Sequence, residues 1–265
     1  MDGGSSPSAG TTFMKRTINI KHSTNFDSLE LAPAPPLHLM EYRESEQAHF
    51  KSGLEDFNAL KNFCSKHFQL SSLNRILDFG CSNARVTRWH DTSQTEVWGC
   101  DLQQNKIIWA QENLGSKIKF FLNTEQPHLP FEDNYFDFIY AHSVFTHIDN
   151  LHHAWLLELF RICKSYVMIT LHDEETMDIN KTPRSVLLRE RFFKDFPADG
   201  IDSSIGFFAS NSYGVHGLSQ VYMTQKYLKS LLPNNISVVD IHPRVFANLQ
   251  TGILMLKTQK HAPVG

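Results

Sequence analysis

The chain has 265 residues, and 41% of them are hydrophobic, which supplies enough apolar surface for one large α/β domain or two small ones. Its formal net charge is −3. The chain therefore lacks the basic excess that drives binding to nucleic acids or anionic membranes, and a small-molecule substrate is expected instead. Neither composition nor charge predicts the oligomeric state.

The four cysteines are widely separated and show none of the Cys-x-x-Cys spacing typical of zinc sites. They are Cys64, Cys81, Cys100 and Cys163. They indicate reduced core residues of a cytoplasmic protein, and no metal is predicted. No apolar run approaches the roughly 20 residues of a membrane span, and the first fifteen residues lack the hydrophobic stretch of a signal peptide.

Residues 1–12 are rich in glycine, serine and proline and contain too little apolar surface to order themselves. The sequence predicts a disordered or extended segment over residues 1–38, followed by one folded domain over residues 39–265. Apolar residues recur at helical spacing between positions 50 and 68, so the first helix is expected there.

The chain is organised around residues 76–88. A short apolar run ends in Asp78, and Gly80 and further small residues precede a helix-compatible segment, a pattern typical of strand, tight turn and helix. Gly80 has no side chain, so the backbone can approach a ligand closely there. The N–H groups that open a helix would also favour an anionic group. The expected ligand is a nucleotide-like cofactor.

From Arg75 onward, apolar strands alternate with amphipathic helices, which predicts a mostly parallel sheet with helices on both faces. Strands are expected at 75–79, 96–101, 118–122, 136–141, 166–172, 236–242 and 252–257. Helices are expected at 83–91, 103–113, 150–163, 182–195 and 224–232. The second strand ends in the carboxylate of Asp101, at about the 20-residue spacing at which an acid accepts hydrogen bonds from ribose hydroxyls.

The segment between the fifth and sixth strands, about 174–232, is too long for a simple crossover. Its middle, residues 200–217, places Phe207, Phe208 and His216 among glycine, serine and asparagine. Long insertions at the carboxyl edge of an open α/β sheet often act as lids. We expect an inserted substrate lid after strand five; the alternative is a surface loop.

Several motifs follow one another in a fixed order: Leu77-Asp-x-Gly-Cys81, Asp101, Leu129-Pro-Phe-Glu-Asp-Asn-Tyr-Phe-Asp137, Ser143-Val-Phe-Thr-His147 and Trp155-Leu-x-Glu158-Leu-x-Arg161. In these motifs and their spacing the chain resembles the class I, Rossmann-like S-adenosylmethionine-dependent methyltransferases. The resemblance implies an α/β fold with a seven-stranded, mostly parallel sheet whose last two strands form an antiparallel hairpin. It also implies S-adenosylmethionine as the cofactor.

The resemblance further implies a set of cofactor-binding residues: Asp78, Gly80, Cys81, Ser82, Arg85, Asp101, Leu102, Asn123 and His142. Arg85 is expected to neutralise a carboxylate, Leu102 to cover adenine, and Asn123 to hydrogen-bond it. Three alternatives stay open. Asp101 is equally placed to cap a helix, and Asn123 to act as a turn residue. The glycine-poor turn with Ser82 and Ala84 has the less favoured alternative of a tight turn that binds no ligand.

The candidate catalytic residues are His147 and His172, which follow the fourth and fifth strands and are expected near His142 at the same edge. A histidine, with an unperturbed pKa near 6.5, can take a proton from a hydroxyl that becomes a nucleophile. The alternative for His147 is a structural hydrogen bond, and His216 is the next candidate base.

The sequence therefore predicts a methyltransferase that moves the methyl group of S-adenosylmethionine to an oxygen or nitrogen of a small molecule. Two alternatives remain. The first is a catalytically inactive S-adenosylmethionine-binding partner protein, which the departures at Ser82 and Ala84 favour. The second is a nicotinamide-dependent dehydrogenase, which Arg85 disfavours because that position needs a small residue for close helix packing.

Overall fold

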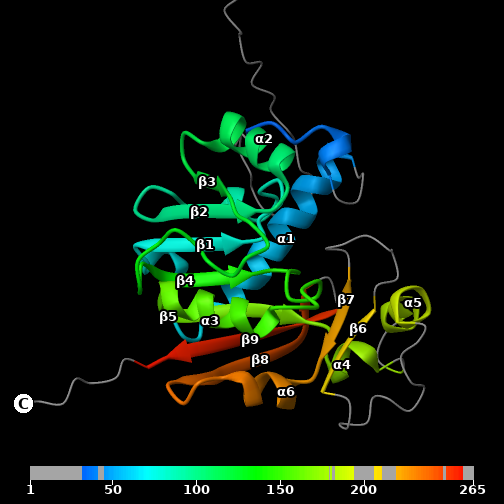
Figure 1. Ribbon diagram of the computed structural model, residues 1–265. Coiled ribbons are helices and arrows are strands. Elements are labelled where there is room, and N and C mark those ends of the chain that lie inside the picture. The colour runs from blue at the N-terminus through cyan, green and yellow to red at the C-terminus, as the bar shows by residue number, and fades with distance from the viewer. Residues whose placement is uncertain are drawn as a thin grey trace, which may run out of the picture.

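The computed structural model describes residues 32–40, 45–178, 180, 183–193, 206–210, 219–246 and 249–258. They contain a seven-stranded sheet in the order β3 (Lys119–Leu122), β2 (Glu96–Asp101), β1 (Arg75–Phe79), β4 (Phe136–Ala141), β5 (Cys163–Leu171), β9 (Gln250–Lys257) and β8 (Ile236–Phe246). Strands β1 to β5 pair in parallel, and β9 is antiparallel to both neighbours. This confirms the predicted Rossmann-like sheet. The carboxyl ends of the parallel strands point to the right in Figure 1.

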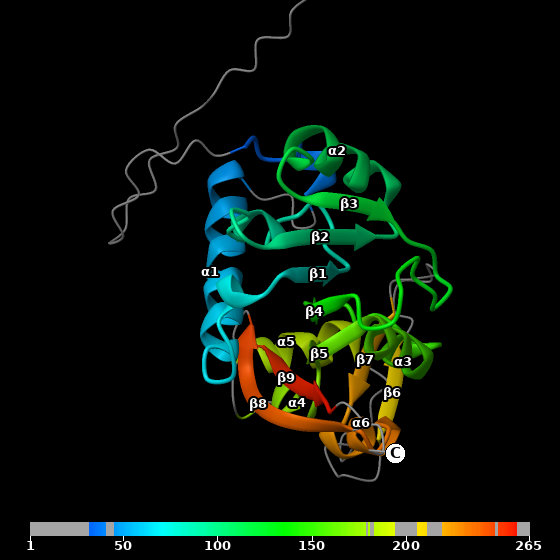
Figure 2. The same cartoon turned by 90° about the vertical axis from the view of Figure 1, so that its left-hand side faces the viewer.

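Three long helices flank the sheet: α1 (Glu46–Cys64), α2 (Gln104–Leu114) and α3 (His152–Ile162). Figure 2 shows α1 on one side of the sheet and α3 on the other. Helix α1 begins at Ser45, whose hydroxyl accepts a hydrogen bond from the backbone N–H of Ala48. In the part of the chain that the structure describes, no helix is both long and apolar enough to cross a lipid bilayer.

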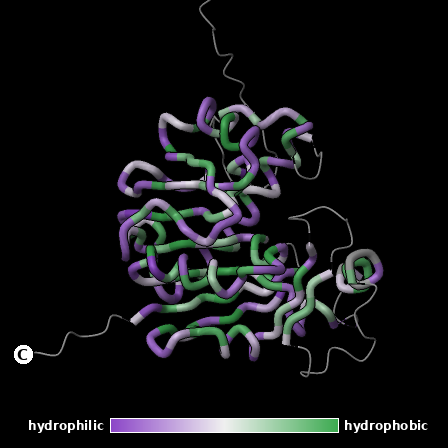
Figure 3. Tube along the Cα trace, viewed as in Figure 1, coloured by the Kyte–Doolittle hydropathy of each residue, from purple (hydrophilic) through white to green (hydrophobic). Residues whose placement is uncertain are grey.

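The core forms two layers because neighbouring residues of a strand point to opposite faces of the sheet. One layer packs residues of α1 against strand residues that share its face: Leu60, Phe63, Cys64, Ile76, Phe138, Tyr140, Met168 and Leu254. The other packs α3 against the alternate positions: Trp155, Leu156, Leu159, Leu77, Ile139, Val167, Ile169 and Ile253. Figure 3 shows hydrophobic residues along the central strands. Burying each such side chain contributes about 1.5–3 kcal/mol, so the sheet is a rigid base for the loops at its ends.

The predicted strands agree with the structure to within a few residues, but the helix expected at 83–91 is wrong. The chain instead continues from β1 through successive turns into a short 3-10 helix, Thr87–Trp89. The physical reason is a left-handed backbone at Ser82 (φ 52°) and Ala84 (φ 60°), which a right-handed α-helix does not allow.

The segment after β5 contains two helices, α4 (Glu174–Met177) and α5 (Pro183–Phe192), and a hairpin of β6 (Phe207–Ser210) and β7 (Gln220–Met223). Helix α6 (Gln225–Leu231) follows. Except for α6, these elements lie beyond the carboxyl ends of the parallel strands (Figure 1). Sequence periodicity predicts α5 and α6 but neither α4 nor the hairpin. His216, named above as a further candidate base, lies outside the described residues, as does the expected disordered segment up to residue 31.

Strand β7 is anchored to the large sheet. The backbone N–H of Met223 donates to the carbonyl of His172 at 3.0 Å, and that of Val221 donates to the carbonyl of Thr146 at 2.8 Å. All four residues of β7 are buried. The described part of the insertion therefore holds together the segments that follow β4 and β5.

Candidate active site

The turn after β1 has an unusual backbone. Gly80 (φ 79°), Ser82 (φ 52°) and Ala84 (φ 60°) all adopt positive φ, at alternate positions. For the two residues with side chains this costs about 1 kcal/mol each. Ser82 is fixed in that conformation, because its N–H donates to Asp101 Oδ2 at 2.8 Å and its hydroxyl accepts from Lys106 Nζ at 2.9 Å.

The N–H groups of this turn are bonded within the protein. Those of Gly80 and Cys81 both donate to the carbonyl of Cys100 at 2.9 Å. A side chain at position 80 would meet Val144, which packs directly on the glycine. The helix N-terminus expected here for an anionic group is therefore not formed.

Helix α1 crosses this turn at Gly53. A Cβ atom there would overlap the carbonyl oxygen of Arg85, so only glycine permits this approach. One helical turn further on, Asp56 accepts a hydrogen bond from Arg85 Nη2 at 2.6 Å, and its Oδ2 lies 3.9 Å from His142 Nε2. Arg85 and His142, both expected to bind the cofactor, thus share one carboxylate of α1. The His142 ring also packs on Phe246, with ring centroids 4.5 Å apart.

Asp78 lies at the centre of a buried polar chain. Its Oδ2 accepts hydrogen bonds from the hydroxyls of Thr87 at 2.6 Å and Tyr140 at 2.8 Å, and Tyr140 lies 3.0 Å from His90 Nε2. Burial raises the pKa of Asp78 to about 7, although the two hydroxyl donors lower it. Burial lowers the pKa of His90 to about 3, so its imidazole is neutral and donates Nε2–H to the tyrosine oxygen.

The ends of β2 and β3 carry an acid, two half-exposed leucines and a buried amide. Asp101 accepts the N–H of Ser82 on Oδ2 and the N–H of Gln103 on Oδ1. Leu102 and Leu122 are each about half exposed, at 49% and 47%, beside this acid. Asn123 is buried, and its Oδ1 has no partner among the described residues, whereas its Nδ2 donates to Thr124 O. An unpartnered buried acceptor beside two apolar side chains fits an aromatic amine such as adenine.

Strand β7 joins the segments that carry His147 and His172, because Val221 and Met223 donate their N–H groups to the carbonyls of Thr146 and His172. His147 Nδ1 lies 2.9 Å from the carbonyl oxygen of Ser219, and the imidazole of His147 adds to the lowering of the pKa of His172. Burial is the main cause and takes that pKa to about 3. His172 is 3% exposed, and its Nδ1 has no partner within the described ranges. His142 contacts Asp56 and Phe246 instead.

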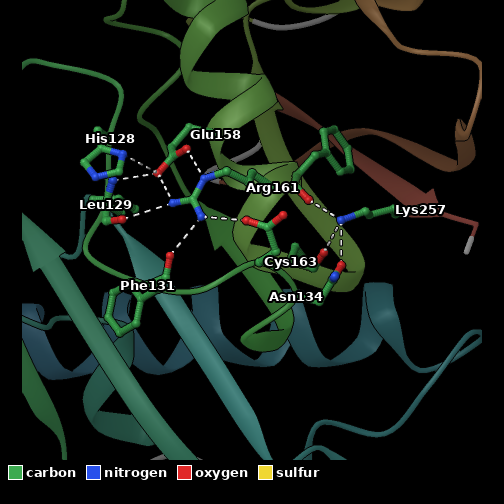
Figure 4. A network of polar contacts seen from close by, with 10 residues as sticks. His128, Leu129, Phe131, Asn134, Glu158, Arg161, Cys163 and Lys257 are labelled. Atoms are coloured by element: carbon green, nitrogen blue, oxygen red, sulfur yellow. Dashed lines mark hydrogen bonds and ion pairs between the residues drawn. The ribbon is translucent and has the colours of Figure 1, made fainter.

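A second polar cluster lies at the opposite, amino edge of the sheet (Figure 4). Arg161 of α3 donates to Glu158 Oε1 and Oε2, to the carbonyls of Leu129 and Phe131, and to Asp133 Oδ1, at 2.7–3.1 Å. All five N–H groups of the guanidinium are thereby used. Glu158 also accepts the backbone N–H of Leu129 at 2.6 Å. This cluster fixes the loop that precedes β4.

The comparison with protein families agrees with this geometry. Residues 77–169 match the family model described as a methyltransferase domain. The match covers β1 through most of β5, and therefore the turn, the acid of β2 and the segment after β4. Residues 77–169 therefore form a methyltransferase domain, and the chain has the Rossmann-like fold of the class I S-adenosylmethionine-dependent methyltransferases, whose cofactor is S-adenosylmethionine. The dehydrogenase alternative is thereby set aside.

Solved structures show the same fold at low sequence identity. A methyltransferase from Methanosarcina mazei is 20% identical, with 74% of this chain and 97% of that chain covered and a TM-score of 0.53. One from Mesorhizobium loti is 12% identical, with coverages of 74% and 96% and a TM-score of 0.55. Magnesium protoporphyrin IX methyltransferase from Synechocystis, with bound S-adenosylhomocysteine, is 13% identical, with coverages of 81% and 88% and a TM-score of 0.54. No curated protein sequence matches the chain.

Sequence reasoning missed several residues of this edge: Asp56, Lys106, Leu122, Tyr140 and Ser219. Lys106 was hidden because a lysine in a helix normally marks an exposed face, yet it is only 6% exposed here. Leu122 had a usable signal, since it directly precedes the predicted adenine-binding Asn123. Asp56 and Ser219 reach the site from distant parts of the sequence, and no local pattern marks them.

Proposed function

We propose that this methyltransferase acts on an oxygen or nitrogen of a small molecule, with His147 as the general base. The position of His147 at the carboxyl edge of β4 carries this proposal. The net charge of −3 supports a small acceptor over a nucleic acid, and one structure of the same fold is a magnesium protoporphyrin IX methyltransferase. The four free, buried cysteines support a cytoplasmic location.

The residues present fit the cofactor. Asp101 would accept the ribose hydroxyls, Asn123 Oδ1 would accept an adenine N–H, and Leu102 with Leu122 would cover the purine. The turn residues Asp78, Gly80, Cys81 and Ser82, with Arg85 and His142, would surround the methionine portion. When bound, S-adenosylmethionine supplies a methyl group on an electrophilic sulfonium. The protein then has to align the acceptor, exclude water and remove a proton.

Of the two histidines expected at the site, His147 is the better base. A folded pKa of about 3 makes His172 a poor proton acceptor at neutral pH. His147 is only partly buried, and its Nδ1 donates to a carbonyl, which leaves the Nε2 lone pair for a substrate proton. His172 would then act as a neutral neighbour that accepts a hydrogen bond.

The test is turnover, measured as S-adenosylhomocysteine formed across a panel of phenols, alcohols and amines. His147→Gln should lower turnover by about 10²–10⁴ and leave the affinity for S-adenosylhomocysteine unchanged. His153→Gln is the matched control, because His153 is exposed on α3. Full turnover in the His147→Gln variant on every accepted substrate would refute the assignment of the base.

We also propose that residues 39–265 form one methyltransferase domain, in which about 174–232 are an inserted lid over the acceptor. The buried strand β7 and the aromatic residues of β6 support this role. Hydrogen exchange that slows in β6 and β7 when S-adenosylhomocysteine and an acceptor bind is expected. Equal exchange with and without ligands would indicate a fixed structural insert.

A further inference from the structure

The segment after β4 is held by the residues that lead into β7. Three hydrogen bonds join them within a few residues on each side. The N–H of Val221 donates to the carbonyl of Thr146 at 2.8 Å, His147 Nδ1 lies 2.9 Å from the carbonyl of Ser219, and the Ser219 hydroxyl donates to Asp149 Oδ2 at 2.6 Å. Residues 219–221 thus contact the backbone, the imidazole and the carboxylate of residues 146–149.

The middle contact determines where the proton of His147 resides. A carbonyl oxygen only accepts hydrogen bonds, so the 2.9 Å contact requires a proton on Nδ1 and leaves the lone pair on Nε2. The amide nitrogen of Gln220 faces the same Nδ1 at 3.3 Å, and because it can only donate, a proton on Nδ1 requires the carboxamide to be turned over so that its oxygen faces the ring. Among the described residues, Nε2 has no hydrogen-bond partner.

The position of the Ser219 carbonyl depends in turn on Asp149. The short 2.6 Å bond from the Ser219 hydroxyl to a carboxylate is charge-assisted, which makes it one of the stronger contacts at this edge. Ser219 is 2% exposed, so water does not readily replace this bond. Asp149 therefore orients Ser219, and the carbonyl of Ser219 in turn orients His147.

We infer that Ser219 and Asp149 are positioning residues, which hold His147 in the Nδ1–H tautomer with Nε2 directed to the acceptor only while β7 is docked. This inference rests on the proposed role of His147 as the base. Without the docked strand, the imidazole loses the partner that fixes its tautomer and orientation. Docking of β7 and preparation of the base are then one event, so the base is set only when residues 219–221 contact residues 146–149.

The direct test is the tautomer of His147 in the full-length protein, from long-range ¹H–¹⁵N spectra of its imidazole, with the His147→Gln variant identifying the signals. The native protein should show a protonated Nδ1 and an unprotonated Nε2. In Ser219→Ala and Asp149→Ala both nitrogen signals should move toward an average of the two tautomers. Ser219→Thr keeps the hydroxyl and should restore the native pattern.

Turnover separates this inference from the proposed function. Ser219→Ala and Asp149→Ala should each lower kcat about tenfold, the effect typical of removing a group that orients a functional one, with the affinity for S-adenosylhomocysteine unchanged and Ser219→Thr restoring kcat. Loss of turnover in His147→Gln with native spectra and full kcat in both alanine variants would overturn the inference and leave the base in place. Full turnover in His147→Gln would overturn the base itself.

Discussion

Two polar clusters at opposite edges of the same sheet differ in how completely their buried polar atoms are hydrogen-bonded. At the amino edge, Arg161 uses all five of its N–H groups, and its partner Glu158 also binds the backbone of Leu129. At the carboxyl edge, Asn123 Oδ1 and His172 Nδ1 are buried without a partner in the described part of the chain. Buried polar atoms are normally paired, so a closed network indicates a structural role and an open one indicates a place for a ligand.

The largest expected effect is a loss of stability when the cluster of Arg161 and Glu158 at the amino edge is disrupted. Arg161→Ala should lower the free energy of unfolding by about 3 kcal/mol, because it leaves the buried carboxylate of Glu158 without its partner. Denaturant unfolding measures this, and Lys51→Ala, which breaks an exposed ion pair with Glu55, should cost less than about 0.5 kcal/mol. A loss of S-adenosylhomocysteine affinity in folded Arg161→Ala would contradict the purely structural role.

The second effect is a loss of cofactor affinity when Asp101, at the carboxyl edge of the sheet, is replaced. Asp101→Ala should weaken S-adenosylhomocysteine by about 2 kcal/mol in titration calorimetry, since charge-assisted bonds to ribose are lost. Asp137→Ala is a close control, because Asp137 likewise accepts two backbone N–H groups, of Asn74 and Arg75, but at the amino edge. If both variants bind equally well, Asp101 serves only to hold its turn.

The fold was predictable from the sequence to different extents in the strands and in the turns that follow them. Strand positions were predicted closely because a strand that is covered on both faces has a continuous apolar run, as in Ile76 and Leu77. The course of the chain after Gly80 was not, since the left-handed backbone at Ser82 depends on Asp101 and Lys106, from other elements. The partners of His147 were likewise hidden, because Ser219 follows it by more than seventy positions.

The third effect depends on pH. The folded pKa of His172, about 3, lies below its unfolded value of 6.5, so only the unfolded chain gains a proton as the pH falls through this range. The stability that neutral His172 contributes is present above pH 6.5 and is lost toward pH 3, at up to about 1.4 kcal/mol per pH unit. Unfolding free energies of His172→Gln should fall less steeply with decreasing pH, while His153→Gln should keep the native slope. Parallel curves for His172→Gln and the native protein would contradict this.

The smallest effect concerns the unpartnered amide of the adenine edge. Asn123→Ala should weaken S-adenosylhomocysteine by about 1 kcal/mol, or about fivefold in Kd, because one neutral hydrogen bond to the purine is lost. Asn113→Ala is the control, since the Asn113 amide donates to the carbonyl of Trp109 within α2. Unchanged affinity in Asn123→Ala would show that its open oxygen does not mark the cofactor.

The crossing of α1 over the turn at Gly53 limits how this protein can vary. Alanine in a helix interior is normally favoured over glycine by about 1 kcal/mol. An alanine at position 53 would therefore stabilise α1 if the helix stood alone. At position 53 the same methyl group would meet the carbonyl of Arg85 and displace the helix that carries Asp56. In a library of all single substitutions selected for growth, the solvent-facing positions of α1 should accept many residues, and position 53 should retain glycine alone.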